Sequence, residues 1–229
     1  MASQTNTRTI SRPAAWVGGI SLLLIAILAG AGNFAALTPL ITVGDATKTA
    51  AAISGSESQF RFGVLCMLIA AVLDVVVAAA LLRIFEPVDR MLAVSAAWFR
   101  VAYSAVFVVA ITQLALVPGL LANPELSNNA IDAFNAIWRI GLILFAAHLL
   151  VIGYLAFRSG FVPRWLAALI GIAGIGYLID GVGTILVSGY VPVVSTVTFI
   201  GEVALIGWLL WTAARRTRPE SALAVAAAS

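Results

Sequence analysis

The chain has 229 residues, of which 62% are hydrophobic and only 10% are charged, and its mean hydropathy is +1.07. A soluble domain usually carries about 25% charged residues, so this composition excludes a water-soluble globule. The net charge is +3, but the basic residues are spread along the chain and form no aromatic-interleaved basic patch, which argues against a nucleic-acid partner.

Apolar runs follow one another along the chain, each long enough to cross a hydrocarbon layer about 30 Å thick. They lie at about residues 14–37, 61–84, 91–117, 133–157, 164–187 and 191–213. Helices satisfy their own backbone hydrogen bonds in lipid. The sequence therefore predicts an all-α membrane protein, a six-transmembrane-helix bundle over residues 14–213, with short cytoplasmic tails at 1–13 and 214–229.

The first run also resembles a secretory signal. Arg8 and Arg12 precede an apolar core at residues 16–28, and residues 29–31 have the A-x-A form of a cleavage site. We favour a membrane span, because the apolar stretch continues to Leu40 and its removal would leave five spans.

The polar connections contain signals for helix starts. Asp45 can cap a short helix over residues 46–53, and Ser56 with Gln59 has the capping-box spacing that would start the second span. Further along, Asn123-Pro124 is an N-cap followed by proline, which predicts a short interfacial helix.

The basic residues predict an orientation. Lys48 and Arg61 fall on the side away from the termini, whereas nine arginines fall on the side of the termini. The positive-inside rule therefore places both termini in the cytoplasm of a multi-pass protein of the inner (plasma) membrane. The nine are Arg8, Arg12, Arg83, Arg90, Arg158, Arg164, Arg215, Arg216 and Arg218.

Ionisable residues also lie inside the predicted spans, where an Asp or Arg costs roughly 2.5 to 3.5 kcal/mol. Such residues should face the bundle interior. Counting from the span ends places four of them deep in the membrane and two, Arg139 and Asp180, in the outer half. The deep four are Asp74, Arg100, His148 and Glu202.

Helical phase divides this set further, because residues advance by about 100° each. Arg139 and His148 are nine positions apart and should point to opposite faces, whereas Arg100 and Tyr103 share a face. We expect Asp180 to pair with Arg139 or with the region of Asn33. A polar track from Ser195 through Thr198 leads to Glu202.

Other patterns carry less information about chemistry. Cys66 and His148 are the only cysteine and histidine, too few for a zinc or haem signature, so we expect no metal and can name no cofactor. The glycines between residues 171 and 183 lie inside a membrane span with no strand before them, which favours close helix packing over a nucleotide loop. The tryptophans are expected to form an interfacial belt.

Two stretches carry a resemblance to a known family. They are DVVVAAALLRIFEPVDRMLAVSAAWFRVAYSAVF (74–107) and GLILFAAHLLVIGYLAFRSGFVPRWLAALIGIAGIGYLIDGVG (141–183). They closely resemble the bacterial membrane family catalogued as domain of unknown function 4386 (DUF4386), over about residues 14–213. Asp74, Arg100, His148 and Asp180 fall where polar positions are expected in that family. The resemblance implies six helices in one domain and brings no activity, substrate or cofactor.

Three functions fit these observations. The first is an intramembrane polar pocket that binds a small lipophilic ligand, with acid–base chemistry in which Asp74 and Glu202 are candidate acids or bases, His148 is a proton relay, and Arg100 and Tyr103 orient them. The second is a proton-coupled transporter, although no inverted repeat or pair of broken helices is evident. The third is a structural or accessory membrane subunit. Whether the protein is an enzyme, and its oligomeric state, stay open.

Overall fold

A computed structural model of the protein describes residues 10–215, and every regular element in this range is helical. It contains six helical segments long and apolar enough to cross a membrane, as the sequence predicted. The first segment joins α1 (Arg12–Ala29), the π-helix η1 (Gly30–Leu37) and the 3₁₀ turn η2 (Thr38–Leu40). The others are α3 (Glu57–Phe85), α4 (Arg90–Leu120), α5 (Pro124–Ser159), α6 (Arg164–Leu186), and α7 (Val194–Thr198) with α8 (Ile200–Ala214).

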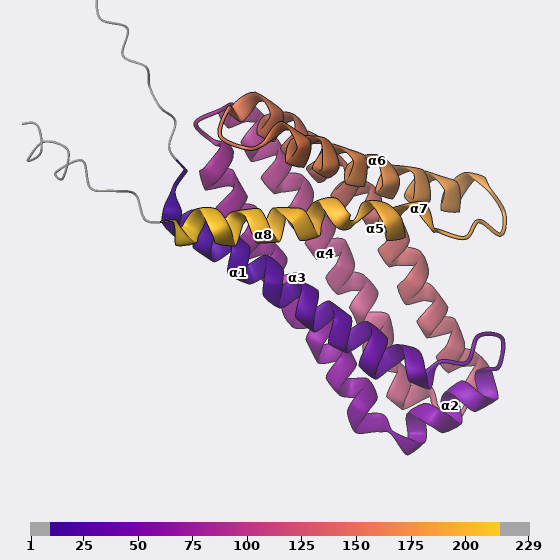
Figure 1. Cartoon of the computed structure of the whole chain (residues 1–229). Coiled ribbons are helices and arrows are strands. Elements are labelled where there is room, and N and C mark those ends of the chain that lie inside the picture. Colours follow the sequence, from indigo (N-terminus) through magenta and orange to yellow (C-terminus); the bar gives the residue numbers. More distant parts are fainter. Residues whose placement is uncertain (1–9, 216–229) are drawn as a thin grey trace, which may run out of the picture.

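The six spans form a ring in chain order. Each span packs against the next one, and α8 returns to pack against α1. The Arg12 side chain ties the ring at this closing point, because its Nε and Nη2 atoms donate to the backbone oxygen of Ala213 at 3.3 and 3.1 Å. Both described ends of the chain therefore lie at one end of the bundle (Figure 1).

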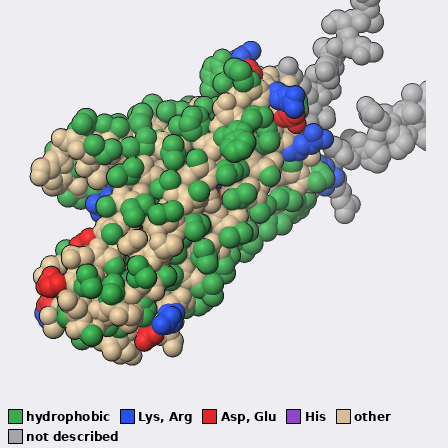
Figure 2. All heavy atoms as spheres, turned by 180° about the vertical axis from the view of Figure 1, so that it is seen from behind, with side chains coloured by type: hydrophobic (Ala, Val, Ile, Leu, Met, Phe, Trp, Pro, Cys, Tyr) green, Lys and Arg blue, Asp and Glu red, His purple; other side chains and the backbone are tan. Residues whose placement is uncertain are grey.

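At the opposite end the bundle divides into two arms (Figure 1). The α2 arm consists of η1, the short helix α2 (Ala46–Gly55) and the neighbouring ends of α3, α4 and α5. The α7 arm consists of the end of α6, residues 187–193 and α7. The space-filling view from behind shows a notch between two such lobes at the end away from the grey tails (Figure 2).

The surface agrees with a bilayer environment. Hydrophobic side chains cover most of the visible face, and charged side chains gather toward its ends and at the notch (Figure 2). Exposed large apolar residues include Leu24 and Ile27 of α1, Val72 of α3 and Ile175 of α6. The predicted tails fall mainly on residues 1–9 and 216–229, which lie outside the described residues, and α1 already begins at Arg12.

The helix starts confirm some sequence signals and correct others. The Asp45 side chain accepts from the Lys48 amide at 2.9 Å and caps α2, and Asn123 accepts from the Leu126 amide at 3.2 Å and caps α5. The separate interfacial helix is wrong, because this cap opens α5 itself, a continuous helix of 36 residues. The Ser56–Gln59 capping box is also wrong, since Ser56 makes no side-chain cap bond.

Glycines permit close helix packing, as predicted. A Cβ atom on Gly153 would come within 3.0 Å of the backbone nitrogen of Gly171, so α5 and α6 touch backbone to backbone. The tryptophan belt is correct only in part. Trp16, Trp98, Trp165 and Trp211 are exposed, whereas Trp208 is buried and Trp138 is half-buried in the interior.

Candidate functional site

Three of the predicted deep residues meet in the bundle interior. The Arg100 guanidinium donates through Nη2 to Asp74 Oδ1 and lies with Nη1 at 3.2 Å from His148 Nε2. These side chains come from α4, α3 and α5, and all are buried, with exposed fractions of 3% for Arg100, 4% for Asp74 and 1% for His148. The structure therefore brings together an ion pair and a histidine that the sequence placed at one depth.

The contacts of His148 define its protonation pattern. Its Nδ1 atom lies 2.8 Å from the backbone oxygen of Ala96, which can only accept, so Nδ1 carries a hydrogen. Its Nε2 atom faces Arg100, which can only donate, so Nε2 must accept. His148 is thus neutral in this arrangement. His148 contacts Arg100 through Nε2 and does not line the cavity described below. Its role as a proton relay stays a prediction.

The buried face of α4 explains why Arg100 has this position. Arg100, Tyr103, Ser104 and Phe107 are all buried, at the spacing of one helix face. The Ser104 hydroxyl donates to the backbone oxygen of Ala71 at 2.6 Å and fixes α4 against α3. The structure therefore confirms the prediction that Arg100 and Tyr103 share one face of α4.

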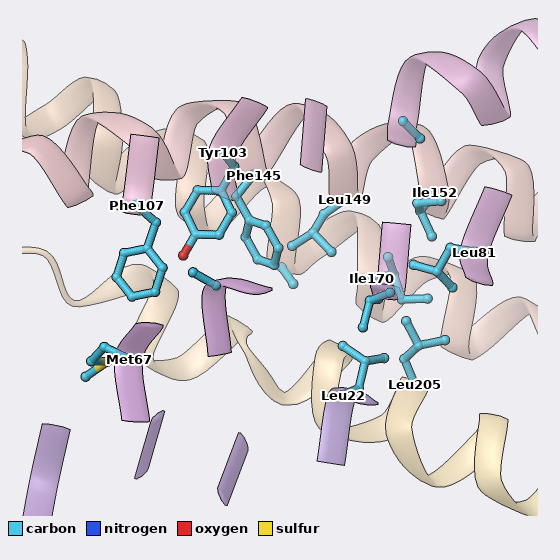
Figure 3. Packing of buried hydrophobic residues seen from close by; sticks show 14 of the residues in the cluster. Leu22, Met67, Leu81, Tyr103, Phe107, Phe145, Leu149, Ile152, Ile170 and Leu205 are labelled. Atoms are coloured by element: carbon cyan, nitrogen blue, oxygen red, sulfur yellow. The ribbon is translucent and has the colours of Figure 1, made fainter. Parts of the chain in front are cut away.

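Aromatic rings from α4, α5 and α6 form a continuous wall beside the ion pair. Tyr103 stacks on Phe107 with ring centroids 5.9 Å apart and lies 4.9 Å from the ring of Phe145. Figure 3 shows these three rings in a row. Tyr177 meets Phe145 edge-on at 5.3 Å, and the Trp138 indole donates to the Tyr103 hydroxyl at 3.1 Å. Trp138 was expected in the interfacial belt, and its bond to Tyr103 corrects this expectation.

Glu202 lies in the first turn of α8 and has a different partner from Asp74. Its Oε1 accepts from the Tyr177 hydroxyl at 2.8 Å, and within residues 10–215 it takes part in no salt bridge. The predicted polar track toward it is partly present. Ser195 lines the same cavity as Glu202, whereas Thr198 packs beside Gly176 of α6 and its buried hydroxyl has no partner in the described chain.

A cavity of about 460 Å³ lies between the two arms, beside the ion pair and the aromatic wall. Asp74, Tyr103, Tyr177 and Glu202 supply its main polar groups, together with Asn33 of η1. Its remaining walls are mostly apolar or aromatic, from α1, α3, α4, α5 and α8; they include Leu22, Ile25, Met67, Phe107, Trp138, Leu142, Phe145, Val203 and Ile206. Phe34 and Phe199 line it too, although their side chains are 73% and 46% exposed. The cavity therefore opens between η1 and the junction of α7 with α8.

Both helices beside this opening are irregular. The first span widens into the π-helix η1, and the Gln59 side chain donates to the backbone oxygens of Ala35 and Ala36 at 3.3 and 3.2 Å. The sixth span is interrupted at Phe199, between α7 and α8. Interruptions of this kind are frequent at functional sites. Gln59 is the one signal of these irregular segments in the sequence, and we interpreted it as part of a helix cap with Ser56.

The Asp180 carboxylate bonds to neither Arg139 nor Asn33, which corrects its predicted pairing. Asp180 is buried and accepts from the Ser195 amide at 2.7 Å, the Val194 amide at 3.3 Å and the Tyr190 hydroxyl at 2.8 Å. It therefore caps α7 from the neighbouring helix, and its hydrogen bond raises the pKa of the Tyr190 hydroxyl. Arg139 is exposed, on the opposite face from the buried His148, as its phase predicted.

Comparison with known proteins gives two matches. A family model described as "Domain of unknown function (DUF4386)" matches residues 17–213. An "Uncharacterized protein" of Archaeoglobus fulgidus is 35% identical over 139 residues, which cover 61% of this chain and 76% of that protein. No solved structure matches the chain.

Proposed function

The chain belongs to the DUF4386 family, and on that premise and the cavity of its interior we propose that it binds a small lipophilic ligand inside the membrane. The observation that carries this proposal is the cavity of about 460 Å³ with mostly apolar walls and a few converging polar groups. Ligand sites in proteins are typically clefts of about 300–1,000 Å³ with this distribution of polar and apolar lining.

The position of the opening supports entry from the bilayer. Phe34 and Phe199 border the cavity while much of each side chain is exposed, as is Val203. These residues belong to membrane spans, so the surface around them faces lipid tails. A ligand dissolved in the hydrocarbon layer reaches the cavity between η1 and α8 without crossing the polar surface.

The predicted orientation of the bundle indicates on which side of the membrane the cavity opens. Arg12, Arg83, Arg90, Arg158 and Arg164 lie at or beside helix ends on the terminal end of the bundle. The positive-inside rule then places this end in the cytoplasm, and residues 14–213 form a single domain of an inner (plasma) membrane protein. The cavity consequently opens in the outer half of the bilayer.

Acid–base chemistry is the finer part of the proposal. Asp74 uses Oδ1 for Arg100 and Glu202 uses Oε1 for Tyr177, and neither second oxygen accepts a hydrogen bond from the described residues. Both side chains line the cavity, so these oxygens can exchange a proton with a bound molecule. Arg100 orients Asp74 from the side of α4, and Tyr177 orients Glu202 from the side of α6.

A transport function is the second candidate, and the two interrupted spans favour it. Transporters often bind substrates where membrane helices are broken, and η1 and the α7–α8 junction flank the opening of the cavity. Flux of protons or solutes in liposomes that is lost in Glu202→Gln would promote this function over simple binding.

The test of the binding function is native mass spectrometry with extraction of lipids and small molecules from purified protein. Ala26→Phe places a ring in the cavity wall at an exposed position of α1, and Ala79→Phe adds the same ring to an exposed position of α3 that does not line the cavity. We expect a stoichiometric lipophilic molecule in the wild type and in Ala79→Phe, and its loss in Ala26→Phe. Equal occupancy in all three proteins would place the ligand elsewhere, and an empty wild type would contradict the proposal.

A further inference from the structure

We propose that the cavity selects a lipophilic cation, an ammonium group on an apolar body, because Glu202 and a set of aromatic rings face the same space and no cation within residues 10–215 pairs with Glu202. This inference rests on the proposed function and names the chemical class of its ligand. The experiment below separates its failure from the failure of ligand binding itself.

The charges around the cavity do not balance. Asp74 and Arg100 form a closed ion pair, and His148 is neutral because its two nitrogens face a backbone acceptor and a guanidinium donor. Glu202 remains as an acid whose one protein partner in the described chain is the hydroxyl of Tyr177. Ionisable residues inside membranes usually pair with one another. Both carboxylates line the cavity, and Glu202 is the one without a cation as partner in the described chain.

The aromatic wall suits a positively charged group. Tyr103, Phe107, Trp138 and Tyr177 line the cavity that also holds Glu202. Aromatic rings attract cations through their negative faces, and quaternary ammonium ligands are recognised by clusters of such rings. Arg100 shows this interaction in the protein itself, since its guanidinium carbon lies 5.1 Å from the centroid of Phe145.

The same geometry disfavours an anionic ligand. Arg100 is the only cation at this depth of the described bundle, and it does not line the cavity. Its Nη1 and Nη2 atoms already contact His148 and Asp74, and its Nε, which has no partner in the described chain, is buried. A carboxylate or phosphate in the cavity would therefore meet Asp74 and Glu202 without a positively charged group in the lining.

The apolar body of the ligand has a separate place. Leu22, Ile25, Val203 and Ile206 line the cavity on the side where α1 and α8 adjoin. A ligand with its ammonium group at Glu202 can lay its apolar part along these side chains toward the lipid. The site thus orients an amphipathic amine by charge at one end and by apolar contact at the other.

The experiment compares two molecules of nearly equal shape. Phenyltrimethylammonium carries a quaternary ammonium group, and tert-butylbenzene replaces the charged nitrogen with carbon. Binding to the full-length protein in nanodiscs is measured by calorimetric titration, with benzoate as the anionic probe. We expect the cation to bind the wild type at least tenfold more tightly than tert-butylbenzene, and benzoate to bind more weakly than both.

Two glutamine variants then locate the charge effect. Glu202→Gln keeps the shape of the side chain, and we expect it to reduce the preference for the cation to less than threefold. Glu125→Gln removes an exposed acid from the first turn of α5 and should leave the preference unchanged. A thermal unfolding curve for each variant verifies that it is folded, and the comparison of the two probes on the wild type requires no variant.

Four results would overturn the inference. Equal binding of cation and isostere would show a pocket without selection for charge, so the proposed function would survive and the ligand class would not. Tighter binding of benzoate, or a preference for the cation that persists in Glu202→Gln, would each refute the assigned role of Glu202. Absence of binding by all three probes would also refute it, while the mass-spectrometric test decides the proposed function independently.

Discussion

Removal of Asp74 should destabilise the protein more than removal of the whole ion pair. In Asp74→Leu the Arg100 guanidinium, which is 3% exposed, keeps only the neutral His148 as a partner. Leaving one member of a buried pair uncompensated costs about 3–5 kcal/mol. In Asp74→Leu/Arg100→Met no charge remains buried there, and the main loss is the unpaired Nε2 of His148, about 1–3 kcal/mol. The double variant should therefore be the more stable of the two.

The assay is unfolding in mixed micelles, in which sodium dodecyl sulfate is titrated into the protein in maltoside and tryptophan fluorescence is followed. Val75→Leu serves as control, because Val75 is the neighbour of Asp74 on the exposed side of α3 and should change stability by less than about 0.5 kcal/mol. A loss below about 1 kcal/mol in Asp74→Leu would refute the reasoning. The reasoning would also be refuted if the double variant lost as much stability as Asp74→Leu and Arg100→Met lose together when each is measured alone.

The remaining predictions concern the helix ends, the packing and pH. Asp180→Ala removes the acceptor for three donors at the start of α7, so amide exchange in α7 should accelerate about fivefold, as loss of a cap worth about 1 kcal/mol implies; an unchanged rate would contradict this. Gly153→Ala should cost about 1–3 kcal/mol in the same unfolding assay, because its Cβ would meet the backbone of α6, whereas Gly207→Ala has free space and should cost nothing. The pKa of Asp45 lies below its ordinary value, mainly because its carboxylate accepts from the Lys48 amide; the cap is therefore present above the ordinary carboxyl pKa and lost as pH falls through the lowered value. The protection of the Lys48 amide, measured relative to its intrinsic exchange rate at each pH, should fall in that acidic range, and Asp45→Asn should remove the pH dependence of this protection.

The fold was predictable because hydrophobicity alone identifies a membrane span. Counting residues from the span ends placed Asp74, Arg100 and His148 at one depth, and helical phase placed Arg139 and His148 on opposite faces. These quantities depend only on the rise and twist of a helix. They therefore hold wherever the helix is regular, as α3, α4 and α5 are through the site.

The parts that sequence reasoning missed involve backbone groups and irregular helices. Asp180 was expected to pair with Arg139 or with the region of Asn33, but its partners include the amides of Val194 and Ser195, and a backbone donor has no signature in the sequence. Gln59 was interpreted as part of a capping box with Ser56, whereas its side chain donates from α3 to backbone oxygens of η1. Each error came from assigning a polar side chain a partner near in sequence or opposite in charge.

The bond from Arg12 to Ala213 has a consequence for biosynthesis. It joins residues 201 positions apart, so α1 receives its neighbour α8 only after the four spans between them have been synthesised. Until then, Gly19 of α1, which packs against Leu210 in the finished protein, lacks this contact. A nascent chain that stops before α8 therefore has an unfinished wall between α1 and α6, and α8 is the helix that closes the cavity.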